Sequence, residues 1–204
     1  MNQSTNTAVR RGRPTEAIFA ANKLIRNTYM LLSMTLLFSA ATAGISMVYN
    51  FPHPGMLITL VGYFGLLFLT SALRNSAWGI ASVFALTGFM GLTLGPIINL
   101  YVHTFANGTE LVMTALGGTG AIFVGLSAYA LSTRKDFSFM GGFVMVGILV
   151  AFLAGIGALI FNLPSLSLAV SGMFVLLMSG YILYQTSAMI HGGETNYIMA
   201  TVGL

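Results

Sequence analysis

Long apolar segments separated by short polar breaks make up nearly the whole chain after residue 27. An α-helix needs about 20 mostly apolar residues to cross the hydrocarbon core of a bilayer. Six segments meet that requirement, roughly over residues 28–49, 55–73, 78–101, 110–131, 139–161 and 164–190. The breaks are short and carry turn-forming residues, and loops of this kind join antiparallel neighbours. The pattern predicts an all-α integral membrane protein.

The chain ends on an unusual pattern. A polar break at 191–196 is followed by an apolar run over 197–204. Eight residues are too few to cross a bilayer. We therefore expect one transmembrane domain, 28–204, in which six spans are complete and a seventh helix begins at 197 but is truncated.

Residues 1–27 read as a basic cytoplasmic tail rather than as a folded domain. The tail is rich in Asn, Gln, Ser, Thr and Arg, and it has no hydrophobic period before Ile18. We expect it to be disordered up to that point. Its residues Arg10, Arg11 and Arg13 fix the orientation of the chain in the membrane. A loose cytoplasmic end is also what an unfolding ATPase can grasp, and the composition does not choose between these two uses.

Composition excludes a soluble enzyme. Only 6% of the residues are charged and 56% are hydrophobic, with a mean hydropathy of +0.88, whereas a soluble domain carries about 25% charged residues. The chain has no cysteine, so it has no disulfide, thiolate nucleophile or Cys-ligated metal. The net charge of +4 is better explained by membrane orientation than by nucleic-acid binding.

The basic residues predict the topology. Five lie in the tail (Arg10, Arg11, Arg13, Lys23 and Arg26), and the other three are Arg74, Arg134 and Lys135 in the second and fourth connections. All eight fall on one side if the N-terminus is cytoplasmic, as the positive-inside rule requires. The surface facing a cytoplasmic partner then includes the loop residues Arg134, Lys135 and Asp136, together with His191 and Glu194 after the sixth span.

No residue pattern indicates catalysis. An ionisable side chain inside a span is normally functional, but none lies near the centre of a span here, which argues against proton-coupled transport and intramembrane proteolysis. The serine-hydrolase elbow and the zinc-protease motif are both absent from the sequence. We expect a non-enzymatic protein with no cofactor and no metal site. His191 and Glu194 have a spacing that a metal site could use, but a helix end at Gly192 explains them better.

Two groups of span residues call for an interpretation. Gln185 is the most polar side chain deep in a helix, and it shares a face with Tyr181, next to Tyr184. Such a cluster either holds the sixth span in place or serves as a functional position.

Glycines on the third and other spans predict close packing. The third span has Gly88, Gly91 and Gly95 ahead of Pro96, which should kink the helix. The surface that these glycines form either packs closely against another helix or borders a cavity. Small residues at every fourth position also predict close packing at Gly117, Ala121 and Gly125 and at Gly147, Ala151 and Gly155.

Four segments carry a resemblance to a known family. They are Leu24–Leu32, the glycine–proline run Thr87–Pro96, the loop Thr133–Asp136 and the ending His191–Ile198. From about Lys23 to Leu204 the chain resembles the bacterial branch of the Bax inhibitor family, which includes a modulator of the FtsH protease. The glycine–proline run occurs across the family, and the His-Gly-Gly-Glu-Thr-Asn-Tyr-Ile ending is specific to that branch.

The resemblance implies a seven-helix bundle in the bacterial inner membrane. It further implies a partner, the membrane-anchored FtsH protease complex, whose degradation of membrane proteins the chain would restrain, with the tail as the cytoplasmic handle. The alternative is a calcium or ion leak, for which the family's pH sensor is a pair of aspartates, one of them after a Tyr in the sixth span. Here Gln185 follows Tyr184, and because glutamine cannot titrate, this departure from the family argues against pH gating.

Overall fold

The fold is entirely helical. The computed structural model describes residues 14–204 of the chain, with side chains from Ile18 onward. Its helices are α1 (Pro14–Val48), α2 (Met56–Leu73), α3 (Trp78–Thr104), α4 (Gly108–Thr133), α5 (Met140–Ile160), α6 (Pro164–His191) and α7 (Tyr197–Gly203). The first six are long and apolar enough to cross a membrane. The predicted all-α fold with six spans and a short seventh helix is confirmed.

Helix α1 is longer than the span predicted for it. It begins at Pro14, so residues 14–27, which we assigned to the tail, continue the first helix. Proline suits the first turn because the N–H that it lacks would have no helical partner there. At 35 residues, α1 is about 52 Å long, which exceeds the ~30 Å hydrocarbon core. The predicted tail residues Arg10, Arg11 and Arg13 lie outside the described residues.

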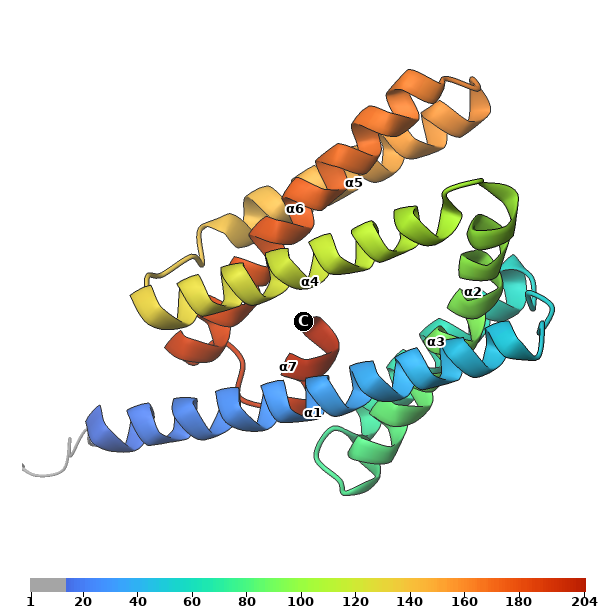
Figure 1. Cartoon of the computed structure of the whole chain (residues 1–204). Helices are drawn as coiled ribbons and strands as arrows, with labels where there is room; N and C mark the ends of the chain where they lie inside the picture. Colours follow the sequence, from blue (N-terminus) through green and yellow to red (C-terminus); the bar gives the residue numbers. More distant parts are fainter. Residues whose placement is uncertain (1–13) are drawn as a thin grey trace, which may run out of the picture.

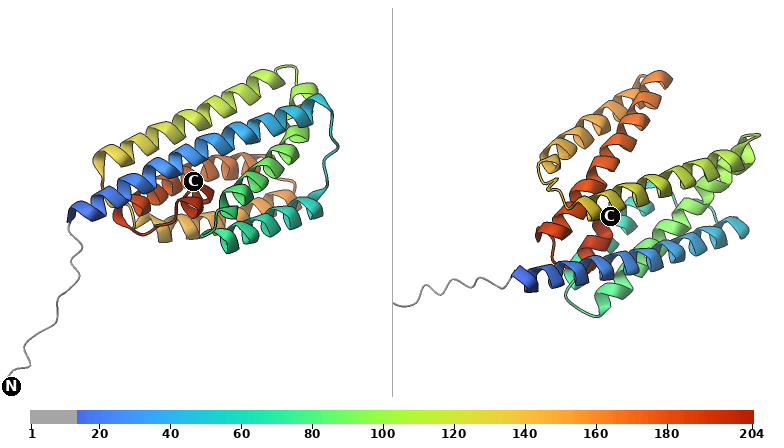
Figure 2. Two further views of the ribbon diagram at one scale, coloured as in Figure 1. Left: turned by 90° about the horizontal axis from the view of Figure 1, so that it is seen from below. Right: turned by 60° about the vertical axis from the view of Figure 1, so that its left-hand side comes forward.

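The long helices form two groups joined by α4 (Figure 1). Helices α1 and α3 pack along each other with α2 against α3, while α5 and α6 form a hairpin. Helix α4 contacts α6 and α3 and so connects the groups. Helix α7 packs mainly on α1 and lies among the long helices rather than at their edge (Figure 2).

Glycines of α3 allow α1 to approach closely. A Cβ on Gly91 would overlap the Thr42 hydroxyl and the Ser39 carbonyl oxygen, and a Cβ on Gly95 would lie 2.8 Å from the Ala43 carbonyl oxygen. On the same face, Gly88 receives the ring of Phe38. The predicted glycine surface is therefore a packing surface.

Pro96 lies inside α3, as expected from the glycine–proline run. A proline has no N–H, so the carbonyl four residues earlier, on Leu92, loses its helical donor. The Ser46 hydroxyl of α1 donates a 2.9 Å hydrogen bond to that carbonyl oxygen. Ser46 is 1% exposed, so the bond is made inside the α1–α3 interface.

The two predicted small-residue stripes behave differently. On α5, Gly147 receives Leu177 of α6, and Ala151 is fully buried, so the predicted packing is confirmed there. On α4 the prediction is wrong, because a Cβ on Gly117 or Gly125 would meet no atom within 4 Å. Helix α4 buries residues only near its two ends, and its glycines at 117, 118, 120 and 125 meet no other helix, although Phe123 between them lies beside Tyr29 of α1.

Candidate functional site

Several predicted functional residues meet at one end of the bundle. The Arg134 guanidinium lies 3.4 Å from the Asn22 amide oxygen of α1, so the α4–α5 loop and the start of α1 are at the same end. Asn196, after α6, donates to the Arg74 carbonyl oxygen at 2.9 Å and so brings the α2–α3 turn there too. We call this end, with Arg74, Arg134 and Lys135, the basic end.

The α4–α5 loop is fixed to α6 by one buried serine. The Phe137 N–H donates to the Ser187 hydroxyl oxygen at 2.9 Å, and that hydroxyl lies 3.4 Å from the Lys135 carbonyl oxygen. One turn later, Nδ1 of His191 lies 3.0 Å from the Ser187 carbonyl oxygen. Ser187 is 0% exposed. The loop that carries Arg134 and Lys135 is therefore held in one position on α6.

Asp136 is oriented by its own loop. Its carboxylate accepts a 2.8 Å hydrogen bond from the Ser138 N–H. Hydrogen bonds from the side chain and backbone of Ser138 lower the pKa of Asp136, and the nearby His191 adds to the effect. An acid with a lowered pKa stabilises the folded state above its unfolded pKa, and that contribution disappears as pH falls through the folded pKa. Asp136 is therefore a permanent negative charge at neutral pH.

The turn between α6 and α7 has the capping role that the sequence predicted for it. Gly192 adopts φ 81° and ends α6, and the Gly193 N–H donates to the Ala188 carbonyl oxygen at 2.8 Å. The Glu194 carboxylate accepts hydrogen bonds of 2.8 Å from two backbone N–H groups of the turn. His191 and Glu194 thus act in the turn, and the residues that the structure describes hold no cluster of potential metal ligands.

Asn196 is a structural residue that sequence reasoning missed. Its side-chain oxygen caps α7 by accepting from the N–H groups of Ile198 (2.9 Å) and Met199 (3.2 Å). Its amide nitrogen donates to the Arg74 carbonyl oxygen and to Asn75. An asparagine directly before an apolar run is the signal that would have identified the cap. Ser187 had no such signal, because its partners come from a distant loop.

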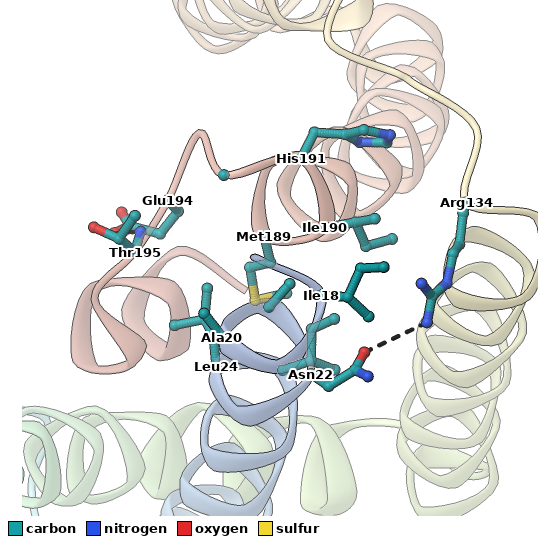
Figure 3. Close-up of a pocket in the computed structure, with 13 residues that line it drawn as sticks. Ile18, Ala20, Asn22, Leu24, Arg134, Met189, Ile190, His191, Glu194 and Thr195 are labelled. Carbon is teal, nitrogen blue, oxygen red and sulfur yellow. Dashed lines mark hydrogen bonds between the residues drawn. The ribbon is translucent and has the colours of Figure 1, made fainter. Parts of the chain in front are cut away.

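A pocket of about 370 Å³ opens at the basic end (Figure 3). Its apolar lining includes Ile18, Leu24, Ile25, Met189 and Ile190, and its polar lining includes Asn22, Arg134, His191, Glu194 and Thr195. Three of the predicted partner-facing residues, Arg134, His191 and Glu194, therefore line one pocket. Lys135 and Asp136 lie in the adjoining loop and do not line it.

The predicted sensor position lies deeper in the bundle. A Cβ on Gly203 of α7 would overlap the Gln185 amide, so the glutamine packs directly on α7. Tyr184 instead packs on Gly141 of α5, and its ring centroid lies 6.1 Å from that of Tyr181. Gln185 therefore faces α7, whereas Tyr184, with Tyr181 beside it, faces α5.

Several hydroxyl groups lie near Gln185, in the region where α1, α6 and α7 meet. The Tyr29 and Thr186 hydroxyl oxygens are 3.4 Å apart, and the Thr201 hydroxyl lies 3.4 Å from the Thr28 carbonyl oxygen. Thr28 and Thr186 are fully buried. No Asp, Glu, Lys, Arg or His belongs to this set of hydrogen-bonding groups.

Comparison with known proteins agrees with the fold and with the ending of the chain. The family model described as "Inhibitor of apoptosis-promoting Bax1" matches residues 21–204. The chain belongs to the Bax inhibitor family. It is 50% identical over 188 residues to the "Modulator of FtsH protease YccA" of Escherichia coli K12, a match that covers 92% of this chain and 85% of that protein.

Similar proteins come from another bacterium and from mouse. An uncharacterised protein of Pseudomonas aeruginosa is 52% identical over 89% of this chain and 81% of its own length. Protein lifeguard 4 of mouse is 26% identical over 88% of this chain and 77% of its own length. No solved structure matches the chain. Family membership and six apolar spans together make the chain a multi-pass membrane protein.

Proposed function

We propose that this chain is a non-enzymatic regulator in the bacterial inner membrane that binds the FtsH protease complex and restrains its degradation of membrane proteins. The observation that carries the proposal is the 50% identity to the modulator of FtsH protease YccA over 92% of this chain. A relative in a second Escherichia coli strain, equally similar, is named "Inner membrane protein YccA". The N-terminus and the basic end would face the cytoplasm, as the positive-inside rule requires.

The basic end supports the proposal because it is built as a rigid surface. Ser187 holds the α4–α5 loop on α6, and Asn196 ties the α6–α7 turn to the α2–α3 turn. A surface with fixed groups loses less conformational entropy on binding than a loose one. Arg134, Lys135 and Asp136 would therefore meet a protein partner at little ordering cost.

The experiment that tests binding is copurification. The full chain, a variant without residues 1–13 and the charge-reversed variant Lys135→Glu are each pulled down from membranes that contain FtsH. We expect the full chain to retain FtsH and both variants to retain less. Glu110→Lys is the matched control, because it reverses an exposed charge that begins α4 at the opposite end from the α4–α5 loop. Failure of the full chain to retain any FtsH contradicts the proposal.

The alternative function, an ion leak, is distinguished from protease regulation by a measurement of calcium flux. Proteoliposomes that contain the full chain are assayed for calcium release at one pH below and one pH above neutrality. We expect no pH-dependent flux, because the amide of Gln185, which stands where the family's leak proteins have a titrating acid, does not titrate. A strong flux that changes with pH contradicts this expectation and favours the leak, whatever the copurification shows.

A further inference from the structure

The pocket at the basic end has a composition that suits one class of ligand. Its walls are the first turns of α1, the last turns of α6 and the turn after α6, with Arg134 at one side (Figure 3). The surrounding spans end at this level, α4 at Thr133 and α6 at His191. The pocket therefore opens where the apolar spans give way to polar residues, which in a bilayer is the headgroup region.

Arg134 supplies a positive charge that no carboxylate within residues 18–204 neutralises. It occupies the left-handed position that ends α4, with φ 50°, and its N–H donates to the Ala130 carbonyl oxygen at 2.9 Å. The guanidinium has one hydrogen bond, at 3.4 Å, to the Asn22 amide oxygen. Within residues 18–204 no acidic side chain forms an ion pair with it. Its other N–H groups remain available, and a guanidinium pairs well with phosphate oxygens.

The acid that lines the pocket is turned away from this charge. Glu194 lies across the pocket from Arg134 (Figure 3). Its carboxylate accepts hydrogen bonds from the backbone N–H groups of Thr195 and Asn196. This negative charge opposes the binding of an anion, but its hydrogen bonds fix it to the turn on the far side.

The floor of the pocket is apolar. Leu24 and Ile25 of α1 face Met189 and Ile190 of α6, and Met189 is 0% exposed. A small hydrated anion gains nothing from such a floor. A ligand whose phosphate is attached to an acyl chain gains both from the guanidinium and from the burial of its first methylene groups. Exposed Lys23 and Arg26 on α1 add attraction for negative headgroups.

We propose that this pocket binds one anionic phospholipid from the same leaflet. Its phosphate contacts the Arg134 guanidinium and the Asn22 amide N–H groups, and the first carbons of its acyl chain lie against Ile25 and Ile190. At about 370 Å³ the pocket takes the headgroup and the adjoining carbons, while the rest of the lipid stays in the bilayer. Arg134 also belongs to the proposed partner-facing surface, but lipid binding does not require FtsH, and its test uses the purified chain alone.

The test is native mass spectrometry of the full chain in a neutral detergent, with equal amounts of phosphatidylglycerol and phosphatidylcholine. We expect one phosphatidylglycerol per chain to be preferred, and Arg134→Gln to weaken that preference about five- to tenfold. Asn22→Ala, which leaves the loop intact, should weaken it by a smaller factor. Arg74→Gln is the matched control, because it removes the same charge from the same end outside the pocket.

Two further arms separate a lipid site from a simple anion site. Ala20→Trp fills the pocket without a change of charge and should abolish the preference, while the thermal melting curve shows whether the variant is folded. Glycerol 3-phosphate, which has the phosphate but no chain, should not compete with the lipid at equal concentration. The proposal is overturned if Arg74→Gln weakens binding as much as Arg134→Gln, if the folded Ala20→Trp variant still binds, or if glycerol 3-phosphate competes equally.

Discussion

The Ser46 hydroxyl of α1 donates a 2.9 Å hydrogen bond to the carbonyl oxygen of Leu92 in α3. That carbonyl is the acceptor that Pro96 leaves without a helical donor. Within a membrane such a group has no water to bond, so an unsatisfied carbonyl is costly. The hydrogen bonding of α3 around Pro96 is therefore completed by a residue of another helix.

Replacing this serine should destabilise the bundle. We expect Ser46→Ala to lower the free energy of unfolding by roughly 1–3 kcal/mol, because a buried carbonyl loses the donor that Ser46 supplies. The measurement is denaturant unfolding of the purified chain in detergent. Ser33→Ala is the control, since the exposed Ser33 hydroxyl bonds only to the Tyr29 carbonyl oxygen of its own helix. Equal losses for the two variants would contradict the role assigned to Ser46.

A double-mutant cycle sharpens that result. Pro96→Ala restores an N–H that can donate to the Leu92 carbonyl oxygen within α3. In the Pro96→Ala background, Ser46→Ala should therefore cost measurably less than in the natural chain. An unchanged cost would show that Ser46 stabilises the interface by packing rather than by this hydrogen bond.

The glycines of α3 and α4 should respond oppositely to alanine. Gly91→Ala places a Cβ against the Thr42 hydroxyl and the Ser39 carbonyl oxygen, so we expect a loss of roughly 1–3 kcal/mol in the free energy of unfolding. Gly117→Ala meets open space, and the higher helix propensity of alanine should leave it neutral or up to about 1 kcal/mol more stable. A stable Gly91→Ala variant would contradict the close α1–α3 approach.

The attachment of the α4–α5 loop should depend on one hydroxyl. Ser187→Ala removes the acceptor of the Phe137 N–H, so we expect hydrogen exchange at the Phe137 amide to accelerate, by roughly fivefold for a hydrogen bond worth about 1 kcal/mol. Ser179→Ala is the control, because its exposed hydroxyl bonds only to the Val175 carbonyl oxygen of its own helix. Unchanged exchange in Ser187→Ala would show that the loop is held by other contacts.

The absence of cysteine makes topology directly measurable. Single cysteines are placed at the exposed positions Ser132, near the basic end, and Asn107, before α4 at the opposite end. In intact cells a membrane-impermeant thiol reagent should label Asn107→Cys and spare Ser132→Cys until the membrane is opened. The reverse pattern would contradict a cytoplasmic basic end.

Much of the fold was predictable because the apolar runs that span a bilayer have a minimum length. The six spans and the start of α7 follow from that length alone. The beginning of α1 at Pro14 did not, because residues 14–27 are too polar to be recognised as part of a span. Helix α4 shows a second limit: a stripe of small residues permits close packing, but whether another helix occupies that face is decided by the whole bundle.

The sequence identified several residues of the site but not their arrangement in space. Charge and turn signals placed Arg134, His191 and Glu194 on the same side of the membrane, but their meeting around one pocket depends on how α1, α4 and α6 cross. The contact between Gln185 and Gly203 could not be predicted from the sequence either. It forms because Gly203 has no Cβ, which leaves room for the Gln185 amide of the other helix. Contacts of this kind depend on helix packing, which a single sequence does not encode as a local pattern.

The central claim, restraint of FtsH, is tested most directly by the lifetime of a membrane substrate of that protease. The substrate's half-life is followed after synthesis is stopped, in cells that lack any related protein and in the same cells producing this chain. Lys135→Glu and Glu110→Lys, at matched levels, serve as test variant and control. We predict a longer half-life with the natural chain and with Glu110→Lys, and a smaller increase with Lys135→Glu. A half-life that the natural chain leaves unchanged would contradict the claim.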